Sequence, residues 1–288
     1  MATSPLATPT ATRAVLVAHG LFTKKRLGQH FLVDDNIVAR ILALADLDPG
    51  ETVLEVGPGI GTLTLALCQT AGAVVAVEQD AELIPVLAET GASCSRLAVL
   101  NADAVSIGMD VVSKPFGSPS ALVANLPYSV AATVVLRFFE FLPSLAFAVV
   151  MVQAEVADRM AAVPGTKDYG AYSVKLQLIA RPITRFFVSR SCFMPPPRVD
   201  SAVIRLERRD DALGEERRAD AFAAADAAFA QRRKTIRNSL RSTLGVPAEQ
   251  LDGALEIAGI DGDMRAETLE PSAFLTLGEQ LRNAGCLD

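Results

Sequence analysis

The chain has no tryptophan, only two histidines, and four cysteines that lie far apart in the sequence. No two cysteines have Cys-x-x-Cys spacing, and the chain has only two histidines, which together argue against a zinc site. The same cysteine spacing does not fit the disulfide framework of a small secreted domain. We therefore expect reduced thiols, with no metal centre and no disulfide framework.

Long hydrophobic runs are also missing. No apolar segment approaches the roughly 20 residues that cross a bilayer. The short apolar stretch at 14–18 has no basic cluster before it, as a secretory signal would require. Because the N-terminus is rich in Thr, Ala and Pro, we expect residues 1–21 to form a disordered tail on a cytoplasmic protein that does not contact a membrane.

Basic side chains are outnumbered, but they are unevenly distributed. The formal net charge is −6, which taken alone argues against a nucleic-acid-binding protein. Residues 34–120 carry three basic and twelve acidic side chains, whereas residues 121–248 carry eighteen basic and twelve acidic ones. The later half can therefore present a positive surface, and the composition allows a polyanionic partner.

Short apolar runs alternate with longer amphipathic segments. Buried strands are expected at 52–56, 73–77, 97–100, 121–124 and 145–152, with helices at 62–70, 80–90 and 130–141. This order predicts an α/β fold with a mostly parallel, doubly wound, Rossmann-like sheet that binds ligands at the carboxyl ends of its strands. Two more strand-like runs follow at 186–189 and 201–206.

The composition changes after Asp210, where the chain becomes rich in Ala and Arg. Residues 215–244 have a helical pattern, and shorter helical segments follow to the C-terminus. The sequence therefore predicts a Rossmann-like domain over residues 22–210 and a small C-terminal helical domain over residues 211–288.

Three glycines, Gly57, Gly59 and Gly61, stand between the first expected strand and the helix that follows it. Because they lack Cβ atoms, the turn can be tight and a ligand can approach the backbone. The spacing differs from the Gly-x-Gly-x-x-Gly of dinucleotide sites, and a loop with no pyrophosphate to bind suits S-adenosylmethionine better than NAD. Close packing of the strand and the helix is the structural alternative.

Two acidic residues follow the next two strands. Glu78 stands where a carboxylate can accept hydrogen bonds from both ribose hydroxyls, and Asp103 where one can accept from an adenine amino group. Either residue alone could be a solvated strand end, but together with the glycine loop they indicate a nucleoside site. Upstream, the segment Lys24–Leu32, which includes His30, could fold over the cofactor as a lid.

The turn Asn125-Leu126-Pro127-Tyr128 closes the fourth expected strand. An adenine amine is a poor nucleophile because its lone pair is delocalised, and the Asn125 side-chain oxygen and the Leu126 carbonyl can hold its N–H bonds out of the ring plane. Pro127 fixes the turn, and Tyr128 can stack on an extruded base, a contact worth ~1–3 kcal/mol. An ordinary strand-to-helix turn is the alternative.

Two further features have weaker interpretations. Phe193 could form the second face of a base sandwich or could pack in the core. The helical domain contains a basic cluster, Arg232, Arg233, Lys234, Arg237 and Arg241. Three of these cations fall at i, i+4 and i+8 and would share one helix face, which could be only a solvated face. Since no acid lies between residues 227 and 248, we favour phosphate contact.

Together these motifs resemble the ribosomal RNA adenine dimethyltransferase family, and they are closest to its small-subunit branch. The resemblance runs from about Phe22 to the C-terminus. It is carried by Leu27–Leu32, Glu55–Gly61, Val77–Asp80, Asn125–Tyr128, Phe193–Ser201 and Gln231–Asn238. Val163–Gly170 also resembles the small-subunit branch, which favours housekeeping modification over the resistance methylation of the sister group.

The resemblance implies a class I methyltransferase domain and N6,N6-dimethylation of two adjacent adenines in the 3′-terminal hairpin loop of 16S rRNA. The implied methyl donor is S-adenosylmethionine, and the implied partner is 16S rRNA within the immature 30S subunit, bound by a monomer without a metal. Cofactor contacts would fall on His30, Leu32, Gly57, Glu78, Asp103 and Asn125, with Gly59 expected beside them from the glycine loop.

Two other functions are weighed against this one. The chain could be an assembly factor that binds the particle without catalysis, which the basic cluster favours and the cofactor acids oppose. It could also be an NAD-dependent oxidoreductase, for which the glycine loop is the only support and the glycine spacing is unfavourable.

Overall fold

A computed structural model describes residues 4–21, 29–209 and 213–287, and the chain divides into two compact units. The sheet unit comprises residues 1–157 and 183–208, and the helical unit comprises residues 158–182 and 209–288. This division differs from the expected boundary after residue 210, because the segment around α8 (Ala171–Ile179) packs against α9 (Glu215–Phe229).

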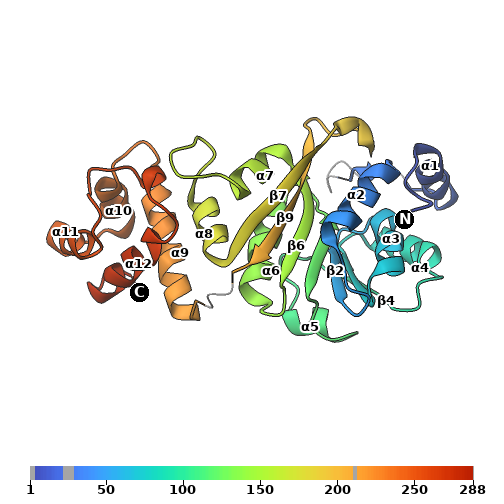
Figure 1. Cartoon of the computed structure of the whole chain (residues 1–288), viewed down its shortest axis with the longest axis horizontal. Helices are drawn as coiled ribbons and strands as arrows, with labels where there is room; N and C mark the ends of the chain where they lie inside the picture. Colours follow the sequence, from blue (N-terminus) through green and yellow to red (C-terminus); the bar gives the residue numbers. More distant parts are fainter. Residues whose placement is uncertain (1–3, 22–28, 210–212, 288) are drawn as a thin grey trace. The chain divides into compact units, whose positions relative to one another are not determined.

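The sheet unit is built on seven strands in the order β4-β3-β2-β5-β6-β9-β7, and Figure 1 shows helices beside them. In the described residues the strands are β1 (Phe31–Leu32), β2 (Thr52–Val56), β3 (Ala73–Glu78), β4 (Leu97–Asn101), β5 (Ala121–Asn125), β6 (Phe147–Gln153), β7 (Ala180–Val188), β8 (Phe193–Met194) and β9 (Ser201–Arg208). The pairs from β4 to β6 are parallel, and β9 runs antiparallel to β6. The predicted α/β sheet is confirmed.

In the sheet unit, α1 precedes the first strand and the later helices follow strands. These helices are α1 (Pro9–Ala18), α2 (Asp35–Ala45), α3 (Thr62–Thr70), α4 (Ile84–Thr90), α5 (Met109–Ser113) and α6 (Ala131–Phe141), with short 3₁₀ turns at Ala81–Leu83 and Arg190–Cys192. The helix α7 (Ala154–Met160) follows β6 and crosses into the helical unit.

The position of β2 decides where a ligand can bind. β2 pairs with β3 on one side and with β5 on the other, because the chain runs outward from β2 through β3 to β4 and then crosses back to β5 on the opposite side of β2. Connections that diverge in this way leave a crevice at the carboxyl ends of the central strands. The glycine loop after β2 and the Asn125–Tyr128 turn after β5 both open into this crevice.

The core explains why apolar residues form these strands. Ala121 and Val123 of β5 lie in a cluster with residues of α2 and α3, such as Val38 and Leu67. The alternate residue Leu122 is fully buried and faces the other side of the sheet, where Figure 1 shows α6. Burial on both faces accounts for the continuous apolar runs in the sequence.

The N-terminal segment is not the disordered tail that its composition suggests. Residues 9–18 form α1, which begins at Pro9 after the N-cap Thr8, whose side chain accepts from the backbone N–H of Ala11. The buried Leu6 and Leu16 join a cluster with Ile60 and Leu83, which flank the crevice. The Thr/Ala/Pro-rich composition wrongly indicated disorder, because Leu6 and Leu16 bury their side chains against Ile60 and Leu83.

The helical unit contains α8, α9, α10 (Ile236–Leu244), α11 (Ala248–Ile257) and α12 (Ala273–Asn283), with a 3₁₀ turn at Ala266–Thr268. α12 crosses α9 closely at Gly278, where a Cβ atom would lie 2.6 Å from the Asp220 carbonyl carbon. Arg282 supports this contact by donating from Nε to Asp220 Oδ1 at 2.7 Å. Alanines along α9 make such close packing possible.

The helix expected over residues 215–244 is in fact two helices. α9 ends at Phe229, and α10 begins at Ile236 after the N-cap Thr235, whose hydroxyl accepts from the Asn238 N–H at 3.4 Å. The residues between them, Ala230–Lys234, form a turn. Thr235, which can cap a new helix, was the local signal for this break. The helical composition on both sides of it obscured that signal.

Among the residues that the structure describes, no helix combines the length and the apolar character needed to cross a membrane.

Candidate active site

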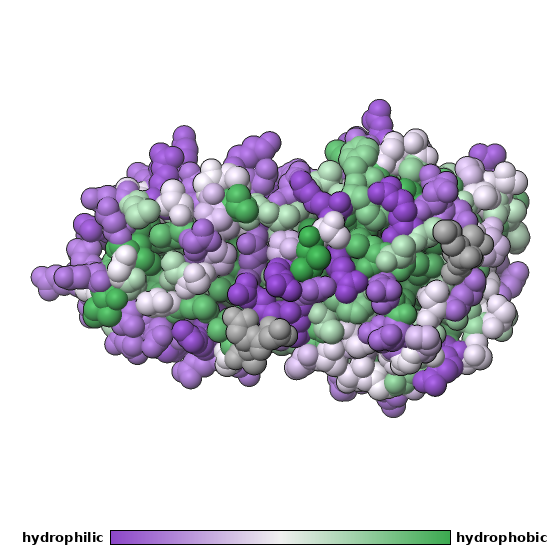
Figure 2. Space-filling model, in the orientation of Figure 1, coloured by the Kyte–Doolittle hydropathy of each residue, from purple (hydrophilic) through white to green (hydrophobic). Residues whose placement is uncertain are grey.

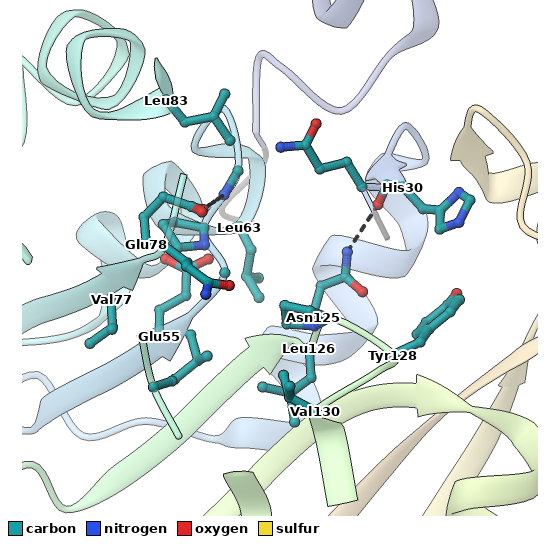
Figure 3. A pocket seen from close by; sticks show the side chains of 18 of the residues that line it. His30, Glu55, Leu63, Val77, Glu78, Leu83, Asn125, Leu126, Tyr128 and Val130 are labelled. Atoms are coloured by element: carbon teal, nitrogen blue, oxygen red, sulfur yellow. Dashed lines mark hydrogen bonds between the residues drawn. The ribbon is translucent and has the colours of Figure 1, made fainter. Parts of the chain in front are cut away.

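One pocket brings together the motifs singled out from the sequence. It lies at the carboxyl ends of β2 to β5, and all of its lining residues belong to the sheet unit. The lining includes the predicted residues His30, Leu32, Gly57, Gly59, Glu78, Asp103, Asn125, Leu126, Pro127 and Tyr128. Figure 3 shows Glu55 and Glu78 on one side of this pocket and Asn125 and Tyr128 on the other.

The glycine loop is close-packed as well as tightly turned. Gly57, Gly59 and Gly61 have φ angles of 70°, 62° and 94°, a region that favours glycine. A Cβ atom on Gly57 would lie 3.0 Å from the ring of Pro127, and one on Gly59 would lie 3.2 Å from Phe31. The structural and functional interpretations of the loop are thus compatible, since Gly57 packs directly against the turn expected to bind the target base.

Glu78 joins β3 to the glycine loop. Its Oε2 accepts from the Gly59 N–H at 3.2 Å, and its Oε1 accepts from the Asp80 N–H at 2.8 Å. Burial raises the pKa of the Glu78 carboxyl, and these backbone donors partly oppose that effect. Each carboxylate oxygen has a second lone pair, so the carboxylate can orient the loop and still accept from a ligand.

Glu55 is a functional candidate that sequence reasoning missed. It lies in β2 at 1% exposure, lines the pocket, and its Oε2 has no hydrogen-bond partner in the described part of the chain. Burial raises its pKa to about 8; the nearby Thr64 hydroxyl opposes this rise and the charge of Glu78 adds to it. The signal was present in the sequence, because Glu55 is the one charged residue in an otherwise apolar strand.

The Asn125 side chain has a defined orientation. Its Nδ2 donates to the carbonyl oxygen of His30 at 3.3 Å, as the dashed line in Figure 3 shows. With the amide nitrogen held there, Oδ1 is the atom available to accept a hydrogen bond from a ligand. This is the arrangement that the proposed acceptor role requires.

Tyr128 stacks on His30 and not on Phe193. The ring centroids of His30 and Tyr128 are 5.6 Å apart with an interplanar angle of 25°. Phe193 is 2% exposed and belongs to the main core cluster, so core packing, the alternative given for this residue, is observed. Phe193 lies on β8, whose pairing with β1 directs its ring inward.

Hydrogen bonds to a later segment support both rings of this stack. His30 Nδ1 donates to the Pro195 carbonyl oxygen at 2.8 Å, and the Tyr128 and Ser201 hydroxyl oxygens are 2.6 Å apart. Burial raises the pKa of Tyr128, so its hydroxyl remains neutral at physiological pH. Residues about 70 to 165 positions apart in sequence therefore position the two aromatic rings.

The other pocket residues lie nearer to solvent. Asp103 is exposed, and its Oδ1 accepts from the Val105 N–H at 2.9 Å, which leaves Oδ2 toward solvent or a ligand. Gln29 donates from Nε2 to Asp80 Oδ2 at 2.8 Å, so this residue of the expected lid contacts the turn that follows β3. The rest of that expectation, Lys24–Gly28, lies outside the described residues.

The basic cluster of the helical unit is less uniform than predicted. Arg232 donates to the carbonyl oxygens of Lys167 and Tyr169, and its Nε lies 3.4 Å from Glu267 Oε2. Arg237 Nε lies 3.2 Å from Asp252 Oδ1. The shared helix face is also wrong, because the helix α10 begins only at Ile236. The exposed remainder of the cluster is Arg233, Lys234 and Arg241.

A family model described as ribosomal RNA adenine dimethylase matches residues 21–283. The chain is 46% identical over 277 residues to the ribosomal RNA small subunit methyltransferase A of Rhodococcus opacus, covering 93% of this chain and 92% of the relative. It is 42% identical to the protein of the same name from Anoxybacillus flavithermus, covering 96% of each.

Solved structures give the same fold. The 23S rRNA methyltransferase ErmE aligns with a TM-score of 0.63 at 28% identity, covering 88% of this chain and 99% of that one. A dimethyladenosine transferase from Plasmodium falciparum aligns with a TM-score of 0.75 at 24% identity over 89% of this chain and 98% of that one, which supports the fold alone. With its Rossmann-like sheet unit and a family match over most of its length, this chain belongs to the ribosomal RNA adenine dimethylase family.

Proposed function

We propose that this enzyme uses S-adenosylmethionine to dimethylate N6 of two adjacent adenines in the 3′-terminal hairpin loop of 16S rRNA, within the immature 30S subunit. The single observation that carries the proposal is the fixed amide of Asn125, which presents an acceptor oxygen beside the glycine-loop pocket. The names of the relatives, small subunit methyltransferases, support the choice of the small subunit.

The pocket residues fit S-adenosylmethionine. The loop at Gly57 and Gly59 leaves the backbone open to a ligand, and Glu78 can accept from ribose hydroxyls at the end of β3. Glu55, which is buried and has an unpaired oxygen, suits the positive charge of the ligand, since a nearby cation favours the ionised carboxylate. When bound, S-adenosylmethionine supplies a methyl carbon on a cationic sulfur, which an amine nitrogen can displace.

The turn after β5 would prepare the adenine amine. Asn125 Oδ1 and the Leu126 carbonyl can accept its two N–H bonds, which holds the nitrogen lone pair away from the ring plane. Pro127 restricts the turn, and its contact with Gly57 fixes the distance between the cofactor loop and the base site. The rate acceleration then comes mainly from orientation, without a strong base.

Tyr128 would stack on the extruded base. One side of its ring contacts His30, so a base would use the other side of Tyr128. The Ser201 hydroxyl holds the phenol in place, which reduces the entropy lost when a base stacks on it. The basic residues Arg233, Lys234 and Arg241 of the helical unit are proposed phosphate contacts.

The test is methyl transfer from labelled S-adenosylmethionine to 30S particles that lack the modification, read by a mass shift at the 3′ hairpin. We expect wild-type protein to modify two adjacent adenines. The Asn125→Ala variant should lose at least about 100-fold in transfer rate even at S-adenosylmethionine concentrations that calorimetry shows to be saturating for that variant. Asn283→Ala, an exposed asparagine at the end of α12, is the matched control.

Unchanged transfer by Asn125→Ala would reject the acceptor role, and modification of another nucleotide by the wild type would reject the proposed substrate. The same variant separates this proposal from a purely binding role in particle assembly. If a transfer-deficient Asn125→Ala protein restored particle maturation in a deletion strain, the assembly role would be favoured.

A further inference from the structure

The segment that contains β7 and the loop to β9 is rich in arginine, and its one acid is Asp200 at the end of the loop. Residues 180–199 contain Arg181, Arg185, Arg190 and Arg198 but neither aspartate nor glutamate, in a chain with a net charge of −6. None of these arginines belongs to the basic cluster of the helical unit. The segment is therefore a second concentration of positive charge.

One face of β7 is open. On the other face, Phe186 lies against α2, with the Arg40 guanidinium 3.7 Å from its ring centroid. Because strand side chains alternate, Ile183, Arg185 and Phe187 share the opposite face. Ile183 is 43% and Phe187 60% exposed, and Arg185 is exposed between them. The strand thus presents aliphatic, cationic and aromatic side chains in a row.

Figure 2, which has the orientation of Figure 1, shows strongly hydrophilic side chains next to strongly hydrophobic ones over the part of the molecule where β7 lies. Ile183 and Phe187 are exposed on β7, which is an edge strand of the sheet. Large apolar side chains grouped on an exposed face are unfavourable in water and typical of a binding surface.

The loop after β7 carries two of the arginines near residues that hold pocket side chains in place. The Arg190 N–H donates to Asp200 Oδ1 at 3.0 Å, and Arg198 lies between Pro195 and Ser201. Pro195 and Ser201 form the hydrogen bonds that support the two stacked rings of the pocket. Three residues span at most about 11 Å, so the Arg198 backbone lies within that distance of both contacts.

We propose that these residues, Ile183, Arg185, Phe187, Arg190 and Arg198, form an arginine–aromatic face that binds the RNA strand flanking the target adenine. Arg190 and Arg198 contact phosphates on that strand, and Phe187 stacks on an unpaired base next to the target. The inference rests on the proposed function, because it takes the ligand to be the RNA substrate.

Charge and chemistry favour RNA over a protein partner. A base that enters the pocket must leave its stack, so the neighbouring loop nucleotides are also unstacked and need a new surface. Exposed aromatic rings beside arginines are the side chains that bind single-stranded nucleic acid in this way. A protein surface would have to supply acidic groups opposite every arginine, whereas a nucleic-acid backbone carries negative charge along its whole length.

The test uses the full chain and a fluorescent RNA hairpin with two adjacent adenines in its loop, with a blunt RNA duplex as the second probe. Arg190→Gln/Arg198→Gln should bind the hairpin at least about tenfold more weakly. Its affinity should also depend less steeply on salt, by about 1.4 to 1.8 in the logarithmic slope. Phe187→Ala should lose about 5- to 100-fold in hairpin affinity with little change in salt slope or in duplex binding.

The control is Arg13→Gln/Arg217→Gln, which removes two exposed arginines from α1 and α9. This variant should bind the hairpin like wild type. All changed side chains are exposed, and circular dichroism together with S-adenosylmethionine affinity checks that each variant is folded. Hairpin affinity and salt slope like those of wild type in both face variants would overturn the proposal.

Two further outcomes are distinguishable. If wild type methylates the small-subunit hairpin and the face variants do so with unchanged KM, the arginine–aromatic face is rejected and the proposed function stands. If wild type binds the hairpin through this face but modifies no adenine in it or in the particle, the proposed function is rejected instead. Face variants that bind RNA normally but lose binding to ribosomal proteins would show that the partner is protein.

Discussion

In the pocket, Asn125 donates from its amide nitrogen to the His30 carbonyl, and its oxygen remains to accept from a ligand. In the basic cluster of the helical unit, Arg232 donates to two carbonyl oxygens, and Glu267 lies beside its guanidinium. Internal hydrogen bonds have opposite consequences in these two regions. They orient a pocket group that has both a donor and an acceptor, but they neutralise the charge that a phosphate contact would need.

The comparison teaches that a cation in the sequence is not yet a binding residue. Arg205 and Arg208 of β9 make the same point within the sheet unit, because both donate to backbone carbonyl oxygens. Arg190 and Arg198 are exposed on the loop beside the pocket, and the one acid of that loop, Asp200, accepts from the Arg190 backbone N–H. The location of acidic and carbonyl partners decides which arginines can bind RNA.

The largest expected effect is on the pH dependence of stability. It comes from the buried Glu55 carboxyl of the pocket, in contrast to the exposed basic cluster of the helical unit. The pKa of this carboxyl is raised from 4.5 to about 8, so between these values the unfolded chain is ionised while the folded chain keeps its proton. The free energy of unfolding should therefore fall as pH rises through this window, by on the order of 4 kcal/mol from this group. Glu55→Gln should remove that part of the slope, as measured by urea unfolding at pH 5.5, 7 and 8.5.

Glu216→Gln on the exposed start of α9 is the control, and its pH dependence should match that of wild type. An identical pH slope in Glu55→Gln and wild type would show that Glu55 is ionised in the folded state. The pocket would then contain a charged carboxylate, and the contrast with the basic cluster would weaken.

The next largest effect tests whether the pocket depends on close packing. Gly57→Ala places a methyl group 3.0 Å from the Pro127 ring at a φ of 70°, and we expect at least a tenfold loss of S-adenosylmethionine affinity in calorimetry. Gly117→Ala has a φ of 85° with open space around the added methyl, so it carries only the backbone cost of about 1–2 kcal/mol. Equal cofactor affinity in the two variants would remove the link between the glycine loop and the target turn.

A third experiment tests the basic cluster itself. Arg232→Gln should lower the free energy of unfolding by about 1 kcal/mol, since half-exposed charged hydrogen bonds are lost. Arg233→Gln should change it by less than about 0.5 kcal/mol. For RNA affinity the order should reverse, with Arg233→Gln the weaker binder in a salt titration. Equal RNA losses in both variants would mean that Arg232 can leave its partners to bind phosphate.

The smallest effect is expected at the Tyr128 hydroxyl. Tyr128→Phe loses the contact with Ser201 but keeps the ring, so methyl transfer should fall by no more than a few-fold. Tyr128→Leu removes the stacking surface and should raise KM for the particle by about 5- to 100-fold. If Tyr128→Phe and Tyr128→Leu were equally impaired in steady-state methylation assays, the hydroxyl and not the ring would be the important group.

Local patterns were sufficient where the backbone itself carried the signal. The strand Thr52–Val56 and the helix Thr62–Thr70 have the predicted bounds, because burial on both faces and a glycine turn between them leave few alternatives. β7 was expected only over residues 186–189 but spans Ala180–Val188. As an edge strand with mostly exposed side chains, it lacks the apolar pattern by which buried strands are recognised.

By itself, the sequence determined the α/β fold, the glycine loop after β2 and the turn at Asn125–Tyr128, since each depends on residue types whose effects act within a few positions. Only the tertiary structure decided that His30 and not Phe193 stacks on Tyr128, that α1 packs beside Ile60, and that Arg232 is held by carbonyl oxygens. These outcomes depend on which distant side chains and carbonyls meet. That proximity is set by the packing of the whole chain, and no local pattern encodes it.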